Sequence, residues 1–199
     1  MSFDLKRDEY EAEEFKGLVL AGEKLNAIEF EDCLFMECDF KEATFRGCSF
    51  TDCRFINCDL SVAKLGSSKF EGVHFENSRL SGIDWALAEY SDFIYDAPYT
   101  FENCIMDYGS FFGLRLHDLV MRECKVSEVD FREADLFGAS FVRSNLAHSI
   151  FRNTKLTKAD FSGAENYTID LTANVVKGAK FSRDEAVHLL EPLGIELVD

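Results

Sequence analysis

Proline, basic residues and long apolar runs are all scarce in this sequence. Two of the 199 residues are proline, so almost every residue can donate a backbone N–H to a hydrogen-bonded ladder. No stretch approaches the roughly 18 consecutive apolar residues of a transmembrane helix, which excludes such a helix. The segment Met1–Glu14 is acidic and lacks an apolar stretch, so we expect no signal peptide and a cytoplasmic protein.

Basic residues are outnumbered by acidic ones. The chain has 37 Asp and Glu against 21 Lys and Arg, which gives a formal net charge of −16. Such a charge repels nucleic acid and anionic membranes, so we expect neither as a partner. Solubility alone would explain this charge unless the acids are arranged on one surface.

Motifs of catalysis and cofactor binding are also missing. The sequence has no G-x-S-x-G, no P-loop and no G-x-G-x-x-G. Its four histidines are scattered, and none forms a pair with metal-ligand spacing. We therefore expect no enzymatic activity, no cofactor, no metal site and no small-molecule substrate.

A large apolar residue recurs at every fifth position. One frame runs without interruption from Phe15 to Trp85, and a second, shifted by one, runs from Phe101 to Phe161. Asn166 interrupts the second frame, which then continues to Phe181. Neither an α-helix nor an alternating strand has this period, so neither is the repeating unit.

The residue two places before each large one is mostly small. All seven cysteines fall at this position, and no C-x-x-C occurs. Because the position would point inward beside a large side chain, we interpret the cysteines as small buried hydrophobes, not as zinc ligands or disulfides. They are Cys33, Cys38, Cys48, Cys53, Cys58, Cys104 and Cys124.

The combined pattern, A/C-x-F/L-x-x, resembles the pentapeptide repeat family. The resemblance implies an all-β fold, a right-handed quadrilateral β-helix in which four pentads close one coil. Coils would stack at ~4.8 Å, with the large and the small residue of each pentad inside. The repeat would make about eight coils. We expect a short C-terminal α-helix to follow them.

The repeat divides the chain into three parts. We predict an N-terminal cap or tail at 1–14, the β-helix at 15–181 and a dimerising segment at 182–199. Sixteen residues separate Trp85 from Phe101, which is three pentads plus one. An irregularity is therefore expected at 86–100. It is either a partner contact or a tolerated insertion.

The negative charge is unevenly distributed over the four expected faces. Because residues 20 apart would share a face, the large residues Phe30, Phe50, Phe70 and Tyr90 mark one of them. Lys69 is its only opposing cation. We predict a partner-contacting acidic face here. Its members are Glu29, Glu31, Asp32, Asp52, Glu71, Glu89 and Asp92.

The C-terminus leaves the repeat. Ser182 and Glu185 have the spacing of a capping box, which predicts a helix over about 183–190, ended by Pro192. The segment has more apolar surface than a cap requires, so we predict a two-fold dimer interface here. Its residues are Val187, Leu190, Leu193, Ile195 and Leu197.

Longer strings carry a narrower resemblance. AVHLLEPLGIELVD at the C-terminus, LSGIDWALAEY and TFENCIMDYGSFFGLRL resemble the gyrase-protecting pentapeptide repeat proteins of the Qnr, McbG and AlbG type. With 86–100 as its sole irregularity, the chain is most similar to the loop-poor AlbG branch. The resemblance implies a homodimeric DNA mimic that binds DNA gyrase, in some cases topoisomerase IV. It also implies protection of that enzyme from a poison such as albicidin or a quinolone, as resistance or self-immunity.

A second reading stays open. Pentapeptide repeat proteins also include scaffolds without a link to gyrase, so the chain could bind some other protein instead. Neither the poison nor the host follows from the sequence.

Overall fold

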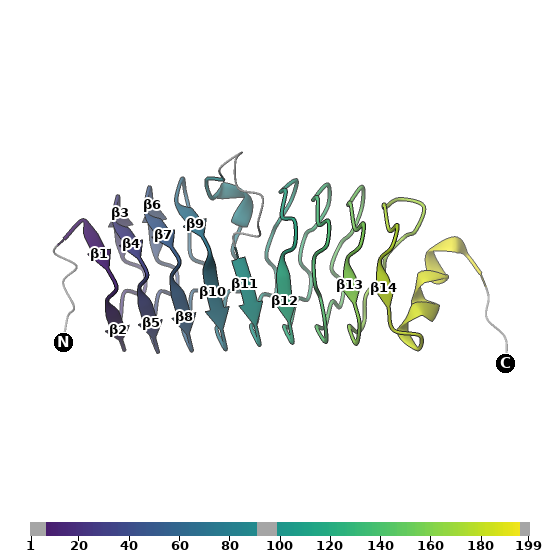
Figure 1. Ribbon diagram of the computed structural model, residues 1–199, viewed down its shortest axis with the longest axis horizontal. Coiled ribbons are helices and arrows are strands. Elements are labelled where there is room, and N and C mark those ends of the chain that lie inside the picture. The colour runs from purple at the N-terminus through teal and green to yellow at the C-terminus, as the bar shows by residue number, and fades with distance from the viewer. Residues whose placement is uncertain (1–6, 91–98, 196–199) are drawn as a thin grey trace.

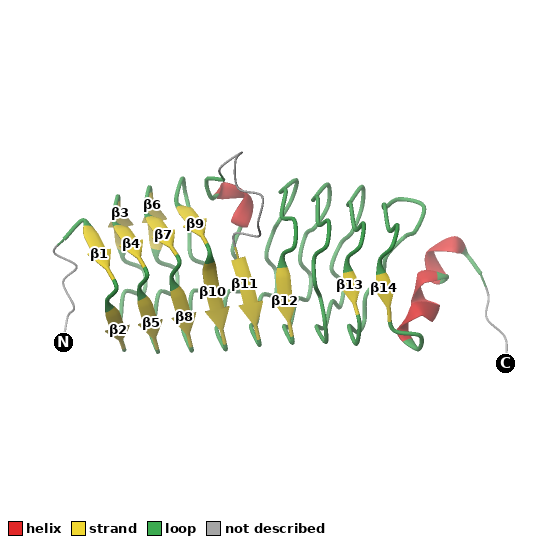
Figure 2. Ribbon diagram, viewed as in Figure 1, coloured by secondary structure: helices red, strands yellow, loops and turns green. Residues whose placement is uncertain are grey.

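The computed structural model describes residues 7–90 and 99–195 as one straight rod of stacked coils (Figure 1). The chain enters at one end of the rod and leaves at the other. Nearly all regular structure is short parallel strand, with helix confined to a few turns (Figure 2). The predicted parallel β-solenoid of about eight turns is confirmed. In the described part of the chain, no helix has the length and apolar character needed to cross a bilayer.

Strands are short because the chain turns a corner after each pentad. The bounds are β1 Glu9–Glu11, β2 Glu14–Lys16, β3 Lys24–Asn26, β4 Glu29–Glu31, β5 Leu34–Met36, β6 Thr44–Arg46, β7 Ser49–Thr51, β8 Arg54–Ile56, β9 Lys69–Glu71, β10 Val73–Glu76, β11 Tyr99–Glu102, β12 Val120–Arg122, β13 Asp160–Phe161 and β14 Lys180–Phe181. Three 3-10 helices are η1 Trp85–Leu87, η2 Glu185–Leu189 and η3 Glu191–Leu193.

Each face of the rod is a parallel ladder. One sheet has the order β1-β4-β7-β9, a second has β12-β11-β10-β8-β5-β2, and β3-β6 and β13-β14 form two-stranded ladders. Phe30 pairs with Phe50, and Phe50 with Phe70, at the expected offset of 20. Between β10 and β11 the offset rises to 26, because Val73 pairs with Tyr99. This coil therefore holds six residues more than its neighbours, and 91–98 lie outside the described residues.

Corners depend on a left-handed residue. The second residue after nearly every large one has a positive φ, as at Asp32 (51°), Asn57 (56°) and Asn103 (51°). Such a φ costs non-glycine residues roughly 1–2 kcal/mol, least for Asn and Asp. The stacked coils must compensate for this strain through core burial and ladder hydrogen bonds.

The interior is a set of ring columns. Phe50 stacks on Phe30 at 5.0 Å and on Phe70 at 4.9 Å between ring centroids. In the second half Phe131 stacks on Phe111 at 5.4 Å and on Phe151 at 5.0 Å. All six rings are buried. The large residue of each pentad thus fills the rod, as its period predicted.

The small inward position is a hydrogen-bonding column as well as a packing site. The Cys53 thiol contacts the carbonyl oxygens of Phe30 (3.4 Å) and Thr51 (3.3 Å). The backbone N–H of Cys58 donates to Ser78 Oγ (3.0 Å). Burial raises the pKa of the Cys53 thiol to about 12, and all seven cysteines are buried and free. The expectation that cysteine is a core residue is confirmed.

The expected C-terminal α-helix and its capping box are wrong. The segment forms the 3-10 helices η2 and η3 instead. Ser182 Oγ accepts a hydrogen bond from the backbone N–H of Gly163 (2.6 Å). Glu185 Oε2 accepts one from the backbone N–H of Asn166 (3.2 Å). The last coil has no following coil to accept these N–H groups, so the two side chains cap the ladder and not a helix.

At Asn166, where the repeat is interrupted, the neighbouring residue fills the core. Asn166 is exposed with a φ of 59°, and the neighbouring Tyr167 is buried in its place. The Tyr167 ring packs against Phe161 at 5.7 Å and Phe181 at 5.5 Å. The core therefore stays filled although the frame is broken.

Candidate partner-binding surface

The sheet β1-β4-β7-β9 presents carboxylates outward and aromatic rings inward. Each of β1 and β4 has a buried central ring between two exposed glutamates. Alternation along a strand sends neighbouring residues to opposite sides, so both glutamates of a strand face solvent. The outward surface of this sheet, with its corner, is called the acidic face. Its members are Glu9, Glu11, Glu29, Glu31, Asp32, Asp52 and Glu71.

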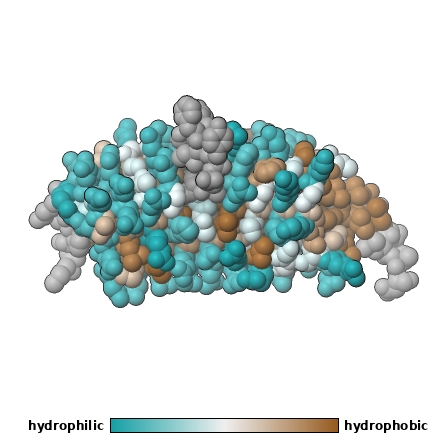
Figure 3. Space-filling view, viewed as in Figure 1, coloured by the Kyte–Doolittle hydropathy of each residue, from teal (hydrophilic) through white to brown (hydrophobic). Residues whose placement is uncertain are grey.

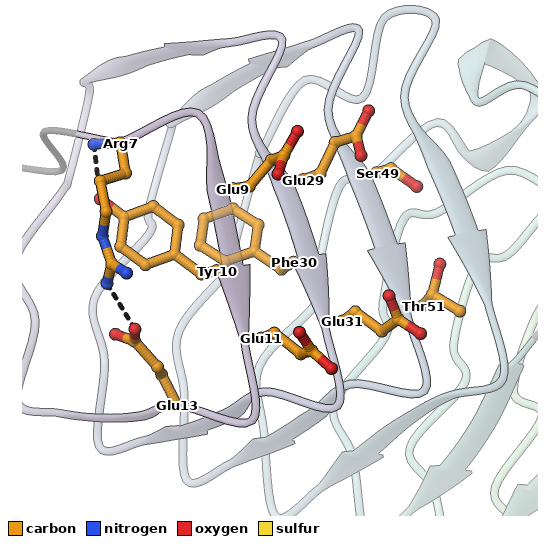
Figure 4. Close-up of a pocket in the computed structure, with 10 residues that line it drawn as sticks. All are labelled: Arg7, Glu9, Tyr10, Glu11, Glu13, Glu29, Phe30, Glu31, Ser49 and Thr51. Carbon is orange, nitrogen blue, oxygen red and sulfur yellow. Dashed lines mark hydrogen bonds and ion pairs between the residues drawn. The ribbon is translucent and has the colours of Figure 1, made fainter.

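Four glutamates stand in register at the N-terminal end of the acidic face. Glu9 pairs with Glu29 across the ladder, and Glu11 with Glu31. Figure 4 shows the two pairs side by side, with all four side chains extending from β1 and β4. Like charges directly opposite one another destabilise a sheet. The fold does not require this arrangement, because the same columns hold Ser49 and Thr51 in the next coil.

A shallow depression of about 440 Å³ lies over these residues. Arg7 is the only cation among the described residues that line it. The Arg7 guanidinium lies 4.5 Å from the Tyr10 ring centre and pairs with Glu13 at the edge (Figure 4). None of Glu9, Glu11, Glu29 and Glu31 has an ion-pair partner within the described part of the chain. Their charge is therefore open to a partner.

The other residues predicted for the acidic face have different positions. Asp32 and Asp52 lie at the following corner, both with a φ of 51°. A Cβ at Gly72 would collide with the Asp52 carboxylate, so the absence of a side chain at Gly72 makes room for that carboxylate. Glu71 ends β9 and makes no ion pair with a described residue. Glu89 differs, because Lys69 neutralises it at 3.3 Å. Asp92 lies outside the described residues.

Sequence reasoning missed Glu9 and Glu11. The repeat was expected to begin at Phe15, and 1–14 was assigned to a cap or tail. Tyr10 stands five residues before Phe15 and is buried in the same column system. That spacing was the available signal. It was overlooked because tyrosine replaces the usual Phe or Leu.

The second half of the rod pairs its charges along the ladders. Arg122 reaches Glu102 at 3.2 Å, Lys155 reaches Asp135 at 3.0 Å, and Lys180 reaches Asp160 at 2.9 Å. Each of these pairs joins residues 20 apart, one coil above the other. A similar pair joins Arg143 and Glu123. The uncompensated stack of acids is thus a property of the first half.

The predicted dimer residues lie at the C-terminal end of the rod. Val187, Leu193 and Ile195 are exposed, and Leu190 is half-buried. Leu197 lies outside the described residues. The buried residue that packs onto the core is Leu189. The sequence analysis named its neighbour Leu190 instead. In Figure 3 the hydrophobic colour is most continuous beside these terminal helices, whereas the N-terminal coils are mostly hydrophilic.

Comparisons with known proteins identify the repeat. The description "Pentapeptide repeat region" matches residues 28–93, and "Pentapeptide repeats (8 copies)" matches residues 115–153 and 134–165. The chain belongs to the pentapeptide repeat family. Together the matches span most of the coils described above.

Solved structures share this fold. A trypsin-treated variant of QnrB1, described as a plasmid-mediated fluoroquinolone resistance protein, superposes with a TM-score of 0.56. The two are 22% identical, over 96% of this chain and 100% of that one. Full-length QnrB1 gives a TM-score of 0.47 at 25% identity, over 94% and 100% of the two chains. No curated protein matches the sequence.

No metal-binding cluster of three or more His, Cys, Asp or Glu side chains occurs in residues 7–90 and 99–195. His117 Nε2 approaches Asp135 Oδ1 at 3.2 Å, beside the Lys155 ion pair described above. This contact belongs to a surface charge ladder. The acidic face is accordingly the strongest candidate for a functional surface.

Proposed function

We propose that the protein is a DNA mimic whose acidic face binds DNA gyrase and protects it from a topoisomerase poison. The observation that carries the proposal is the in-register stack of unpaired carboxylates on β1 and β4. Coils repeat at ~4.8 Å, and phosphates along one DNA strand repeat at about 3.4 Å of axis. A rod with such a column presents negative charges to a basic DNA-binding saddle. The spacing of these charges is similar to that of the phosphates in the DNA that the saddle binds.

Electrostatic complementarity explains what this face would do. It would steer the rod toward a positively charged groove and orient it there, so association should slow as salt rises. A rod seated in the groove would exclude the DNA on which a poison acts. The same reasoning extends to topoisomerase IV, which has a comparable DNA-binding task.

The sequence strings that resemble the Qnr, McbG and AlbG type support the assignment to gyrase. The likeness to QnrB1 supports the fold, and its description as a resistance protein suggests the setting. We include a homodimer through the exposed residues of η2 and η3. Two copies would carry twice −16, or −32. The protein would act by binding alone, in the cytoplasm, without catalysis or a cofactor.

A supercoiling assay tests the proposal. Purified wild-type protein should inhibit DNA supercoiling by gyrase at high concentration. At lower concentration it should restore activity in the presence of albicidin or ciprofloxacin. The expected signature is a reduction of poison-stabilised cleaved DNA. Absence of both effects at every concentration would refute the gyrase assignment and favour a scaffold for another protein.

A further inference from the structure

A second surface differs in chemistry from the acidic face. It lies on the adjoining face of the rod, which contains β3, β6, η1 and the segments 110–112 and 130–132, and is called the β3 face. In Figure 1, β3 and β6 follow the upper edge of the rod beside β1, β4 and β7. Five large apolar side chains of the described residues are exposed on this face or at its corners, of which Ile150 lies farther along the rod. The other four form the apolar patch. They are Val62 (49% exposed), Leu87 (58%), Tyr108 (66%) and Phe112 (43%).

The ladder register brings these four residues into neighbouring coils. Asp84 pairs with Ser110, so Leu87 stands beside Gly113 in the next coil. The N–H of Gly82 donates to the carbonyl of Asp107 (2.8 Å), which places Gly82 one coil below Tyr108. A Cβ at Gly82 would lie 3.5 Å from Val62 Cγ2. Gly82 thus lies between Val62 and Tyr108, and Gly113 lies beside Leu87, so neither glycine covers these apolar side chains.

The apolar patch is held in a fixed arrangement. Leu87 belongs to η1, whose Trp85 is buried and whose first turn is closed by a hydrogen bond from Ala86 N–H to the Asp84 carboxylate (3.1 Å). The Arg132 guanidinium lies 5.6 Å from the Phe112 ring centre. Exposed apolar residues presented rigidly beside an arginine have the composition of a protein–protein contact. They need little further ordering to bind a partner.

The first coils of the β3 face carry cations where the acidic face carries carboxylates. Lys24, Arg46 and Lys64 all project from it, since Lys24 pairs with Thr44 and Thr44 with Lys64. None of the three makes an ion pair with a described residue. In a chain of net charge −16, three free cations on one ladder form a local site for carboxylates. A basic DNA saddle would be repelled here.

We propose that the β3 face is a second docking surface, for a protein segment that carries carboxylates beside apolar or aromatic side chains. The apolar side chains would cover Leu87 and Phe112, and the carboxylates would pair with Lys64 and Arg46. This partner chemistry is the reverse of that required by the acidic face. The proposal does not depend on gyrase, because the two faces would be occupied independently.

Selection from a display library of random twelve-residue peptides tests the proposal. The full-length protein is the bait, and the double variant Leu87→Ser/Phe112→Ser is the counter-selection, which removes peptides bound to the acidic face. We expect a surviving set rich in Glu or Asp together with Leu, Phe or Trp. These peptides should bind the double variant at least tenfold more weakly than wild type. Lys64→Glu/Arg46→Glu should weaken them about as much.

Matched controls separate a lost surface from a lost fold. Val175→Ser changes an exposed apolar side chain several coils away and should leave binding unchanged. Each variant should also keep the wild-type melting temperature. The proposal is overturned if no peptide survives counter-selection. It is equally overturned if the survivors are basic or uncharged, or if they bind the Lys64→Glu/Arg46→Glu variant as tightly as wild type.

Discussion

The two halves of the rod, residues 7–90 and 99–195, share one coil geometry but differ in what fills it and what covers it. In the first half the interior columns are largely phenylalanine, and cysteine is frequent at the small position. In the second half leucine, methionine and valine alternate with phenylalanine, and Ser144, Ser149 and Thr154 take small positions. Because both halves keep the ladder offset of 20, the coil requires inward residues of suitable size and tolerates several chemistries.

The surfaces differ more than the interiors. Residues 1–100 contain 21 acids and 10 bases, a net of −11, whereas residues 101–199 contain 16 acids and 11 bases, a net of −5. The second half stacks acid on base between coils, and the first half stacks Glu9 on Glu29 and Glu11 on Glu31. The second half shows that this fold can compensate its charges. The first half also pairs Lys69 with Glu89, yet it leaves the four glutamates of β1 and β4 uncompensated at a cost in stability, which points to binding.

The largest effect should come from the aromatic columns. Phe50→Ala removes a ring stacked on both sides and should destabilise the protein by about 3–5 kcal/mol. Leu146→Ala, at an equally buried position in the second half, should cost about 1 kcal/mol less because no ring stacking is lost. Urea unfolding followed by circular dichroism measures both. Equal losses would show that ring stacking adds nothing to burial.

Next in size is the hydroxyl column of the second half. Ser144 Oγ accepts from the N–H of Cys124 (2.9 Å) and donates to the carbonyl of Met121 (3.0 Å). Ser144→Ala leaves that buried N–H unsatisfied and should cost about 1–3 kcal/mol. Ser144→Cys should recover part of the loss, because Cys124 Sγ lies 3.4 Å from the Cys104 N–H in the preceding coil. Thermal melting of the two variants distinguishes hydrogen bonding from packing.

A smaller effect of opposite sign is expected on the acidic face. Glu29→Lys/Glu31→Lys would place ammonium groups opposite Glu9 and Glu11 and imitate the second half. Each new cross-strand pair should contribute about 0.2–1 kcal/mol, so the melting temperature should rise slightly. Binding to gyrase should fall in the same variant. A lower melting temperature would mean that the glutamates have a structural role that is not apparent in the ladder.

The smallest effect concerns a surface pair of the second half. Arg132 donates hydrogen bonds to Asp130 and so holds the pKa of that carboxyl below its usual value. A depressed pKa stabilises the fold above the ordinary range near pH 4, and the contribution is lost as pH falls through the lowered value. Arg132→Gln should therefore lower the stability only slightly at neutral pH, because the pair lies at the surface. The difference between variant and wild type should vanish in urea titrations at low pH.

Most of the fold could be predicted from the sequence, because the inward residues recur every five positions, with a small residue two places before each large one. The acidic face followed from the same period, since residues 20 apart share a ladder. Its two N-terminal glutamates were missed where Tyr10 departs from the usual residue type. The C-terminal capping box failed for a different reason. Ser182 and Glu185 have the right spacing for a helix cap. In the structure they accept hydrogen bonds from N–H groups at the end of the ladder, 19 residues earlier in the chain, and the local sequence does not show this contact.

Affinity for gyrase after two matched charge reversals tests the central claim most directly. One variant carries Lys in place of Glu9, Glu11, Glu29 and Glu31. The other carries Lys in place of Asp118, Glu128, Glu133 and Glu165, acids of the second half that make no ion pair among the described residues. Both change the net charge by the same amount, so surface plasmon resonance against immobilised gyrase compares position alone. The first variant should lose roughly 100-fold in affinity and the second only a fewfold. Equal losses, or full binding by the first variant, would contradict the account.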